Sequence, residues 1–219
     1  METGNITATV FTAYLQCPTK GLLIARGEDP PQTFFLGLQK NISKVYKAKF
    51  CGNALVNFRD LVTLSSRRDT ITLFDCQSAF YNTKSSAAIR NDGQVKKTHG
   101  YVPVLYSAWN KLDQSDRLVI CFGAIAVAQA TGTALPRAGQ IVFGDIGRTK
   151  RVTISEKLIR KAKRTVEQIT KESESDELRP VVLNKHCQIC DFQARCRGIA
   201  VSREDLSLLA TMTKKNVKN

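Results

Sequence analysis

The sequence predicts an α/β or α+β domain in which helices surround a central sheet. Segments with apolar residues at helical spacing alternate with short runs rich in β-branched and aromatic residues, in the order helix, strands, helix, strands, helix. At 219 residues, of which 42% are hydrophobic, the chain is long enough to bury one core. No internal repeat is visible.

Two helices are predicted near the N-terminus. Thr7 precedes an apolar run and is expected to cap a helix that ends near Pro18. A second helix is expected over residues 33–50, with one apolar face opposite a lysine-rich face. The residues that define the apolar face at helical spacing are Phe34 or Phe35, Leu38, Ile42 and Val45.

The middle of the chain predicts strands. Residues 69–76, 85–90 and 100–107 are short β-rich runs, and the sequences NTKS and RNDGQ between them are typical of turns. Ser115 and Asp116 then open a helix that continues to about Ala130 and closes at Gly132. Because this helix is apolar on most sides, we expect it to pack against the sheet.

A further hairpin is predicted from residues 139–144 and 150–155, and Ser155 is expected to cap the helix that follows. The inward face of that helix is expected to consist of Leu158, Ile159, Ala162, Val166 and Ile169. Its polar face is crowded with lysine and arginine.

The net charge of the chain is +14, from 33 Lys and Arg against 19 Asp and Glu. A surplus of this size favours a polyanion as partner, because each phosphate contact releases counterions. We expect no membrane partner, since no stretch approaches the roughly 20 apolar residues that cross a bilayer. The start of the chain does not have the pattern of a signal peptide, so we expect a cytoplasmic protein whose seven cysteines are not a disulfide framework.

Three of these cysteines, Cys187, Cys190 and Cys196, have the spacing C-x2-C-x5-C. Thiolates at such spacing suit zinc or an iron–sulfur cluster, and both centres require a fourth ligand. His186 would complete a zinc site, whereas a distant cysteine would complete either centre. A third interpretation, that the cysteines are free and buried, suits Cys51, Cys76 and Cys121 better, because each lies in an apolar run.

The segments YLQCP, YVPV, LPRAGQIVFGD and HCQICDFQARC together resemble the RecB-like nuclease family of the PD-(D/E)XK superfamily. Its members include CRISPR-associated exonucleases and helicase-fused domains with an iron–sulfur staple. The resemblance implies a restriction-endonuclease-like core, in which helices flank a central mixed sheet, and a C-terminal iron–sulfur segment. It implies one domain over residues 1–200 and a tail over residues 201–219 that begins a helix or a linker. The implied ligands of a structural [4Fe–4S] cluster, with zinc as the alternative, are Cys17, Cys187, Cys190 and Cys196.

The same resemblance indicates where a nuclease would hold Mg²⁺ or Mn²⁺, and these positions lack the required groups. They are occupied by Asn41, Ala87 (or Ser86), Leu105 and Ser107, where the family has acidic residues and a lysine. We therefore expect a catalytically inactive module. The alternative is an active DNA exo- or endonuclease whose metal is held by relocated carboxylates such as Asp75 and Asp92.

Since the catalytic positions lack the required groups, DNA binding is the expected function, and the resemblance implies a superfamily 1 helicase as a partner. The remaining alternative is a zinc-stapled scaffold for protein interactions. The expected nucleic-acid contacts are basic residues in segments with few acids. They are Lys40, Lys44, Arg148, Lys150, Arg151, Lys157, Arg160, Lys161, Lys163 and Arg164.

Overall fold

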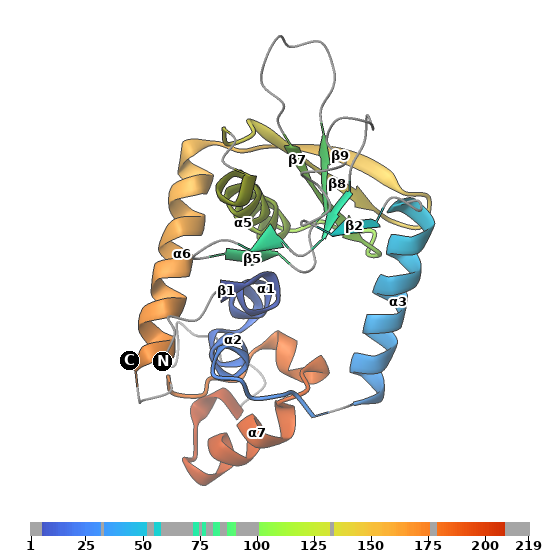
Figure 1. Cartoon of the computed structure of the whole chain (residues 1–219). Coiled ribbons are helices and arrows are strands. Elements are labelled where there is room, and N and C mark those ends of the chain that lie inside the picture. The colour runs from blue at the N-terminus through green and yellow to red at the C-terminus, as the bar shows by residue number, and fades with distance from the viewer. Residues whose placement is uncertain are drawn as a thin grey trace.

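The computed structural model of the chain describes residues 6–31, 33–51, 55–57, 72–74, 76–77, 81–83, 87–90, 101–131, 134–175 and 179–208. In these residues the protein has an α/β fold (Figure 1). The helices are α1 (Ala8–Gln16), α2 (Pro18–Ala25), α3 (Phe34–Cys51), α5 (Gln114–Thr131), α6 (Glu156–Glu174) and α7 (Gln193–Ser202), with 3-10 helices η1 (Lys185–Ile189) and η2 (Leu206–Leu208). The strands are β1 (Ile6–Thr7), β2 (Leu55–Asn57), β3 (Thr72–Phe74), β4 (Cys76–Gln77), β5 (Tyr81–Thr83), β6 (Ala87–Arg90), β7 (Tyr101–Ser107), β8 (Ala138–Phe143) and β9 (Arg148–Thr153).

The largest described sheet has four strands in the order β6-β7-β8-β9 and is mixed. The β7 strand runs antiparallel to β6 and parallel to β8, whereas β8 and β9 form an antiparallel hairpin. Leu105 lies opposite Ile141 in this register, and Ile141 lies opposite Lys150. Shorter pairings join β1 to β5, β5 to β4, and β2 to β3. The strands of the described segments therefore form several sheets rather than one.

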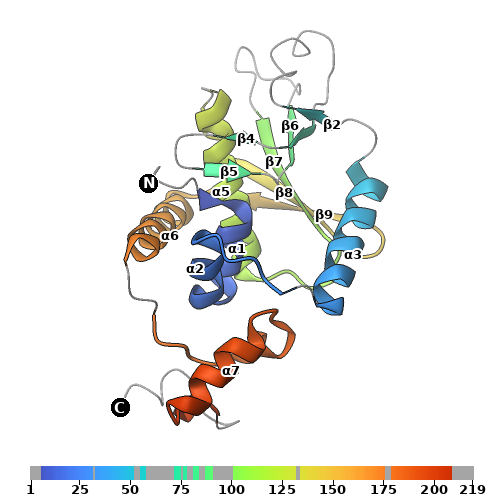
Figure 2. The same ribbon diagram turned by 60° about the horizontal axis from the view of Figure 1, so that its bottom comes forward.

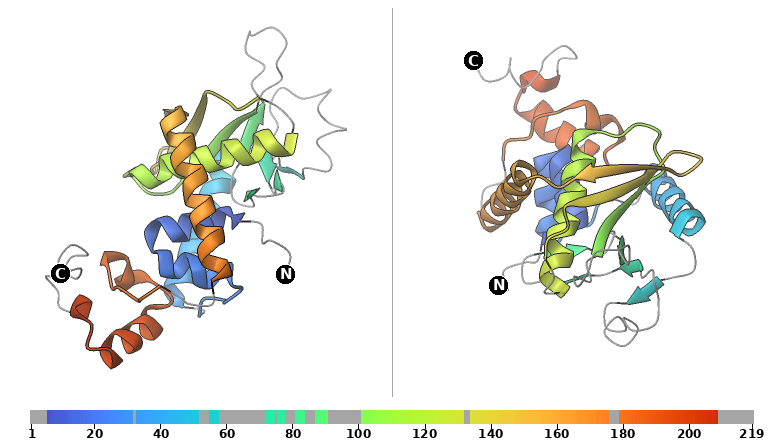
Figure 3. Two further views of the ribbon diagram at one scale, coloured as in Figure 1. Left: turned by 90° about the vertical axis from the view of Figure 1, so that its left-hand side faces the viewer. Right: turned by 90° about the horizontal axis from the view of Figure 1, so that it is seen from above.

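The hydrophobic core lies between the four-stranded sheet and helices α1, α5 and α6 (Figure 3). Phe11 of α1 stacks on Phe122 of α5 with ring centroids 4.5 Å apart. The α5 helix packs closely on the sheet at Gly139, where a Cβ atom would lie only 2.5 Å from Cγ2 of Ile120. The α3 helix lies at the opposite end of the molecule from α6, as Figures 1 and 3 show. Tyr46 joins α3 to the β8–β9 hairpin by donating a hydrogen bond of 2.7 Å to the carbonyl oxygen of Gly144.

Several local predictions are confirmed. The Thr7 hydroxyl caps α1 by accepting a hydrogen bond from the amide of Val10, and the Ser155 hydroxyl caps α6 in the same way. The α5 helix is buried along most of its length, as its apolar composition predicts. The hairpin of β8 and β9 forms as expected. Gly132, the expected end of α5, lies outside the described residues.

Two predictions are wrong, and one helix was not predicted. The first helix does end near Pro18, because α1 ends at Gln16, but Pro18 then occupies the first turn of a second helix, α2, where its missing amide hydrogen has no intrahelical role. Leu38 and Val45 of α3 are 44% and 65% exposed, and Tyr46 is buried instead, because the polar end of its ring reaches the hairpin. The NTKS segment is not wholly a turn, since Asn82 and Thr83 pair within β5.

Candidate metal centre

Cys17 lies at the junction of the first two helices. It ends α1, where its amide donates a 2.8 Å hydrogen bond to the carbonyl oxygen of Ala13, and it directly precedes α2. The two helices pack so closely that a Cβ atom at Gly21 would lie 2.5 Å from Cβ of Tyr14 and 2.6 Å from its Cα. The orientation of Cys17 therefore depends on a glycine one turn into α2.

The other three cysteines lie on a compact C-terminal segment that begins at Asn184. The Asn184 side chain caps η1 by accepting a 2.8 Å hydrogen bond from the amide of His186. The backbone amide of Asn184 donates a 3.2 Å hydrogen bond to Sγ of Cys187. Cys190 ends η1, and Cys196 is buried within α7. A short capped helix followed by a longer helix thus presents three sulfur atoms from one segment.

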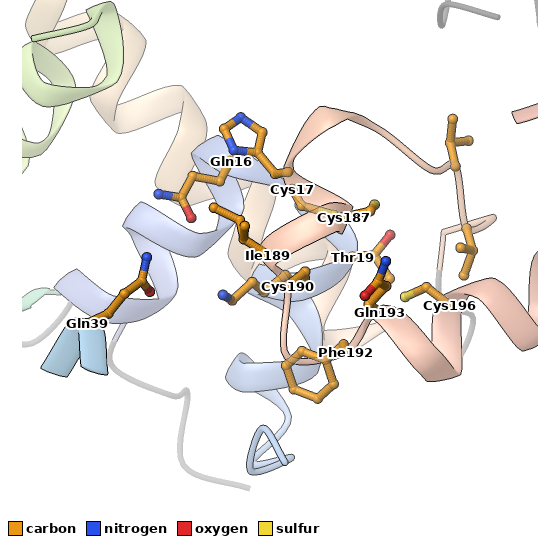
Figure 4. Close-up of a pocket in the computed structure, with 14 residues that line it drawn as sticks. Gln16, Cys17, Thr19, Gln39, Cys187, Ile189, Cys190, Phe192, Gln193 and Cys196 are labelled. Atoms are coloured by element: carbon orange, nitrogen blue, oxygen red, sulfur yellow. The ribbon is translucent and has the colours of Figure 1, made fainter. Parts of the chain in front are cut away.

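The four cysteines line a single cavity of about 90 Å³ between α1, α2, η1 and α7. Figure 4 shows Cys17 at the end of α1, Cys187 and Cys190 on the turn beside it, and Cys196 directed toward that turn from α7. The cavity is completed by Gln16, Thr19, Lys20, Gln39, Val181, Val182, His186, Ile189, Phe192 and Gln193. Segments from both ends of the described chain therefore meet around one sulfur-lined space.

Electrostatics within the cavity reflect the mutual proximity of these thiols. Burial and, to a lesser extent, the neighbouring Cys17, Cys190 and Cys187 raise the pKa of Cys196 to about 11, because burial disfavours the charged form and thiolates repel one another. Burial also raises the pKa of Cys190, although a hydrogen bond from the amide of Phe192 and the charge of Lys20 oppose the rise. These two buried thiols would become good ligands once a cationic centre displaced their protons.

Direct contacts also hold the C-terminal segment against the N-terminal helices. Asp191 is buried, and its carboxylate accepts hydrogen bonds from Thr33 Oγ1 at 2.7 Å and from Lys20 Nζ at 3.5 Å. An apolar cluster around Leu23 and Phe192 lies next to them. Figure 2 shows the resulting arrangement, in which α7 lies beneath α1 and α2. Sequence patterns gave no signal for Asp191, because its partners are far away along the chain.

The donor set fits a soft metal, since four thiols and one imidazole surround the same space. Within the described ranges, however, no group of three or more His, Cys, Asp or Glu side chains is arranged to hold a metal ion. Of the cysteines expected to be free, Cys121 is fully buried in α5, whereas the side chains of Cys51 and Cys76 lie outside the description.

The positions implied for catalysis are distributed over separate elements. Leu105 on β7 is half-buried and packs against the core, and Ser107 lies two residues farther along the same strand. Asn41 is exposed on α3, and Ala87 lies in β6. The fallback residues Asp75 and Asp92 lie outside the described residues.

The basic residues expected to bind nucleic acid form two separate groups. One group is exposed on β9, the edge strand of the four-stranded sheet, and on the first half of α6. It consists of Arg148, Lys150, Arg151, Lys157, Arg160, Lys161, Lys163 and Arg164, and we call it the β9–α6 basic surface. Lys40 and Lys44 are exposed on α3, which lies across the molecule from α6 and contacts the β8–β9 hairpin through Tyr46.

No family model and no curated protein matches this chain at a significant level. Among the described segments, no helix is both long enough and apolar enough to cross a bilayer. The site must therefore be interpreted from its own geometry and chemistry.

Proposed function

We propose that this chain is a DNA-binding module with a RecB-like nuclease fold, catalytically inactive, and closed by a structural [4Fe–4S] cluster. The observation that carries the proposal is the cavity in which Cys17 meets Cys187, Cys190 and Cys196. When bound, the cluster would supply four iron–sulfur bonds that link the α1–α2 junction to η1 and α7. Such a long-range link stabilises the fold by restricting the unfolded chain.

We prefer a cluster to a single zinc ion because the family that the sequence resembles holds a [4Fe–4S] cluster with one cysteine before the core and three after it. Zinc requires four ligands that converge on one point, with each sulfur about 2.3 Å from the metal. A cluster is a larger body, and its cysteine ligands surround it from farther apart. All four cysteines line one cavity, as four ligands of one centre must. The amides of Asn184 and Phe192 also donate hydrogen bonds to cysteine sulfurs, as the negative charge of metal-bound thiolates favours.

Inactivity is supported by the chemistry of β7. A metal-dependent nuclease needs carboxylates to hold Mg²⁺ or Mn²⁺ and a lysine to stabilise charge. Leu105 has no group that coordinates a cation, and its side chain contributes to the core instead. The hydroxyl of Ser107 carries no charge with which to replace a lysine. The proposal therefore assigns this strand a structural role.

DNA binding is supported by the β9–α6 basic surface. Its α6 members form no hydrogen bond or ion pair through their side chains with any residue that the structure describes. Their positive charge is thus not cancelled locally and remains available to phosphates. By the resemblance to helicase-fused domains, we propose that the module holds DNA beside a helicase motor.

The test is DNA binding over a range of salt concentrations. Replacing Arg160 and Lys161 with glutamine should weaken binding several-fold and lower the salt dependence, because phosphate contacts are lost. The control is the exposed pair Lys171 and Arg197, replaced in the same way, since it removes the same residue types from the end of α6 and from α7. Equal effects of the two variants would argue against this surface. Cleavage of the DNA with Mg²⁺ or Mn²⁺ would contradict the proposed inactivity.

A further inference from the structure

A second hollow lies where α5 begins, between the helix and the sheet. Its volume is about 210 Å³, larger than that of the cysteine cavity. One wall is formed by Leu112, Asp113, Gln114 and Arg117 at the start of α5, and the other by Ile141, Lys150 and Val152 of the β8–β9 hairpin. Arg117 and Lys150 therefore approach the same space from a helix and from an edge strand.

The two cations of this hollow are available to a ligand. Arg117 and Lys150 are both exposed, and neither forms a hydrogen bond or an ion pair with the residues in the described ranges. Beneath them the floor is apolar, because Ile141 and Val152 are almost fully buried. The hollow thus combines two unpaired positive charges with an apolar base.

Asp113, the one acidic residue that lines the hollow, forms hydrogen bonds with the first turn of α5. The Asp113 carboxylate accepts hydrogen bonds from the amides of Ser115 at 2.6 Å and Asp116 at 3.1 Å, and from the Ser115 hydroxyl. These bonds hold the pKa of Asp113 below its usual range, with the Ser115 hydroxyl as the main cause. Asp113 thereby caps the first turn of α5, so a ligand in the hollow would depend on the side chains of Arg117 and Lys150 rather than on the helix end.

We propose that this hollow binds one internal phosphate of a DNA backbone, with Arg117 and Lys150 as its ligands and the apolar floor against the neighbouring sugar. The inference rests on the proposed DNA-binding function and adds Arg117 to the β9–α6 basic surface. Two cations suit the two free oxygens of a backbone phosphate. Lys150 also lies next to Arg151 on β9, so the hollow continues the exposed basic surface.

The first experiment measures DNA affinity against salt concentration for Arg117→Gln/Lys150→Gln and for the control Lys171→Gln/Arg197→Gln. The hollow variant should bind several-fold more weakly, and the slope of log K against log salt should fall by about 1 in magnitude, since the contact with one phosphate is removed. The control should change neither quantity to this extent. Identical affinities and slopes for the two variants would overturn the proposal.

A second experiment separates the hollow from the proposed function. Inorganic phosphate is titrated into the whole chain while the side-chain Nε–H signal of Arg117 is followed by NMR. If phosphate shifts this signal although DNA does not bind, the hollow is an anion site and the DNA-binding function fails. If neither phosphate nor DNA has an effect, both proposals are overturned. If the Arg117→Gln/Lys150→Gln variant loses affinity only for oligonucleotides that carry a terminal phosphate, the assignment to an internal phosphate is overturned.

Discussion

Lys20 Nζ lies 3.5 Å from Asp191 Oδ2 and thereby links α2 to the residue that directly follows Cys190, 171 positions away along the chain. Thr33 donates to the other oxygen of the same carboxylate. These contacts hold the two walls of the cysteine cavity together without any metal. We therefore expect the cavity to exist before the cluster is inserted.

Replacing Asp191 with alanine should lower the free energy of unfolding by about 1.5–3 kcal/mol, because a buried, charge-assisted hydrogen bond from Thr33 and the contact with Lys20 are lost. Urea denaturation of the metal-free protein measures this loss. The exposed Asp145, replaced by alanine, is the control and should change stability by less than about 0.5 kcal/mol. Equal stability of the two variants would show that Asp191 does not hold the walls of the cavity together.

Gly21→Ala should destabilise the protein by about 1–3 kcal/mol, because the added Cβ would collide with the backbone and Cβ of Tyr14. The same change displaces α2 from α1 and should reduce the metal content, since Cys17 lies between them. Gly37→Ala in α3 is the matched control. No atom lies within 4 Å of a Cβ there, so this variant should keep its metal and gain up to about 1 kcal/mol. A Gly21→Ala protein as stable as the control would show that the contact is unimportant.

The raised pKa of Tyr14 predicts that the folded protein loses stability at high pH. Burial and its 3.0 Å hydrogen bond to Glu172 raise the pKa of the phenol from 10.0 to about 12, and so favour its neutral form in the folded protein. This stabilisation is complete below pH 10 and disappears as the pH rises through about 12. Urea denaturation of the wild type and of Tyr14→Phe over that range measures it. The stability difference between them should shrink as the pH rises, and a constant difference would contradict the assignment.

Cys196 and Cys121 provide a matched test of the ligand set, since both are buried and burial raises the pKa of each to about 11. Cys196→Ala should lose iron and melt at a lower temperature, because a ligand of the cluster is removed. Cys121→Ala removes a thiol from the core and should retain its iron. Iron analysis and thermal denaturation distinguish the two. Equal iron contents would exclude Cys196 as a ligand.

Features that depend on neighbouring residues were predictable from the sequence. The caps at Thr7 and Ser155 and the buried faces of α5 and α6 follow from residue type and helical spacing alone. The exposure of Val45 on α3 was not predictable, because periodicity locates an apolar face but does not say what covers it. Pro18 is compatible with either end of a helix, so its role in starting α2 was missed.

The candidate site, too, was predictable only where its residues are close together in the sequence. Spacing alone grouped Cys187, Cys190 and Cys196, but only the resemblance to a nuclease family connected Cys17 to them. The contact between Lys20 and Asp191 joins distant segments and leaves no local pattern. Arg117 was not predicted as a ligand, because a single arginine in a helix gives no sequence signal. Its proximity to Lys150 becomes evident only from the hollow that both residues line.

The most direct test of a sulfur-bound cluster between the two ends of the chain is metal and sulfide analysis of protein purified without oxygen, together with its visible spectrum. We predict a brown protein with iron and acid-labile sulfide in equal amounts, both of which are lost in Cys17→Ala. A colourless protein with one zinc per chain, or a Cys17→Ala variant with unchanged iron, would contradict the account.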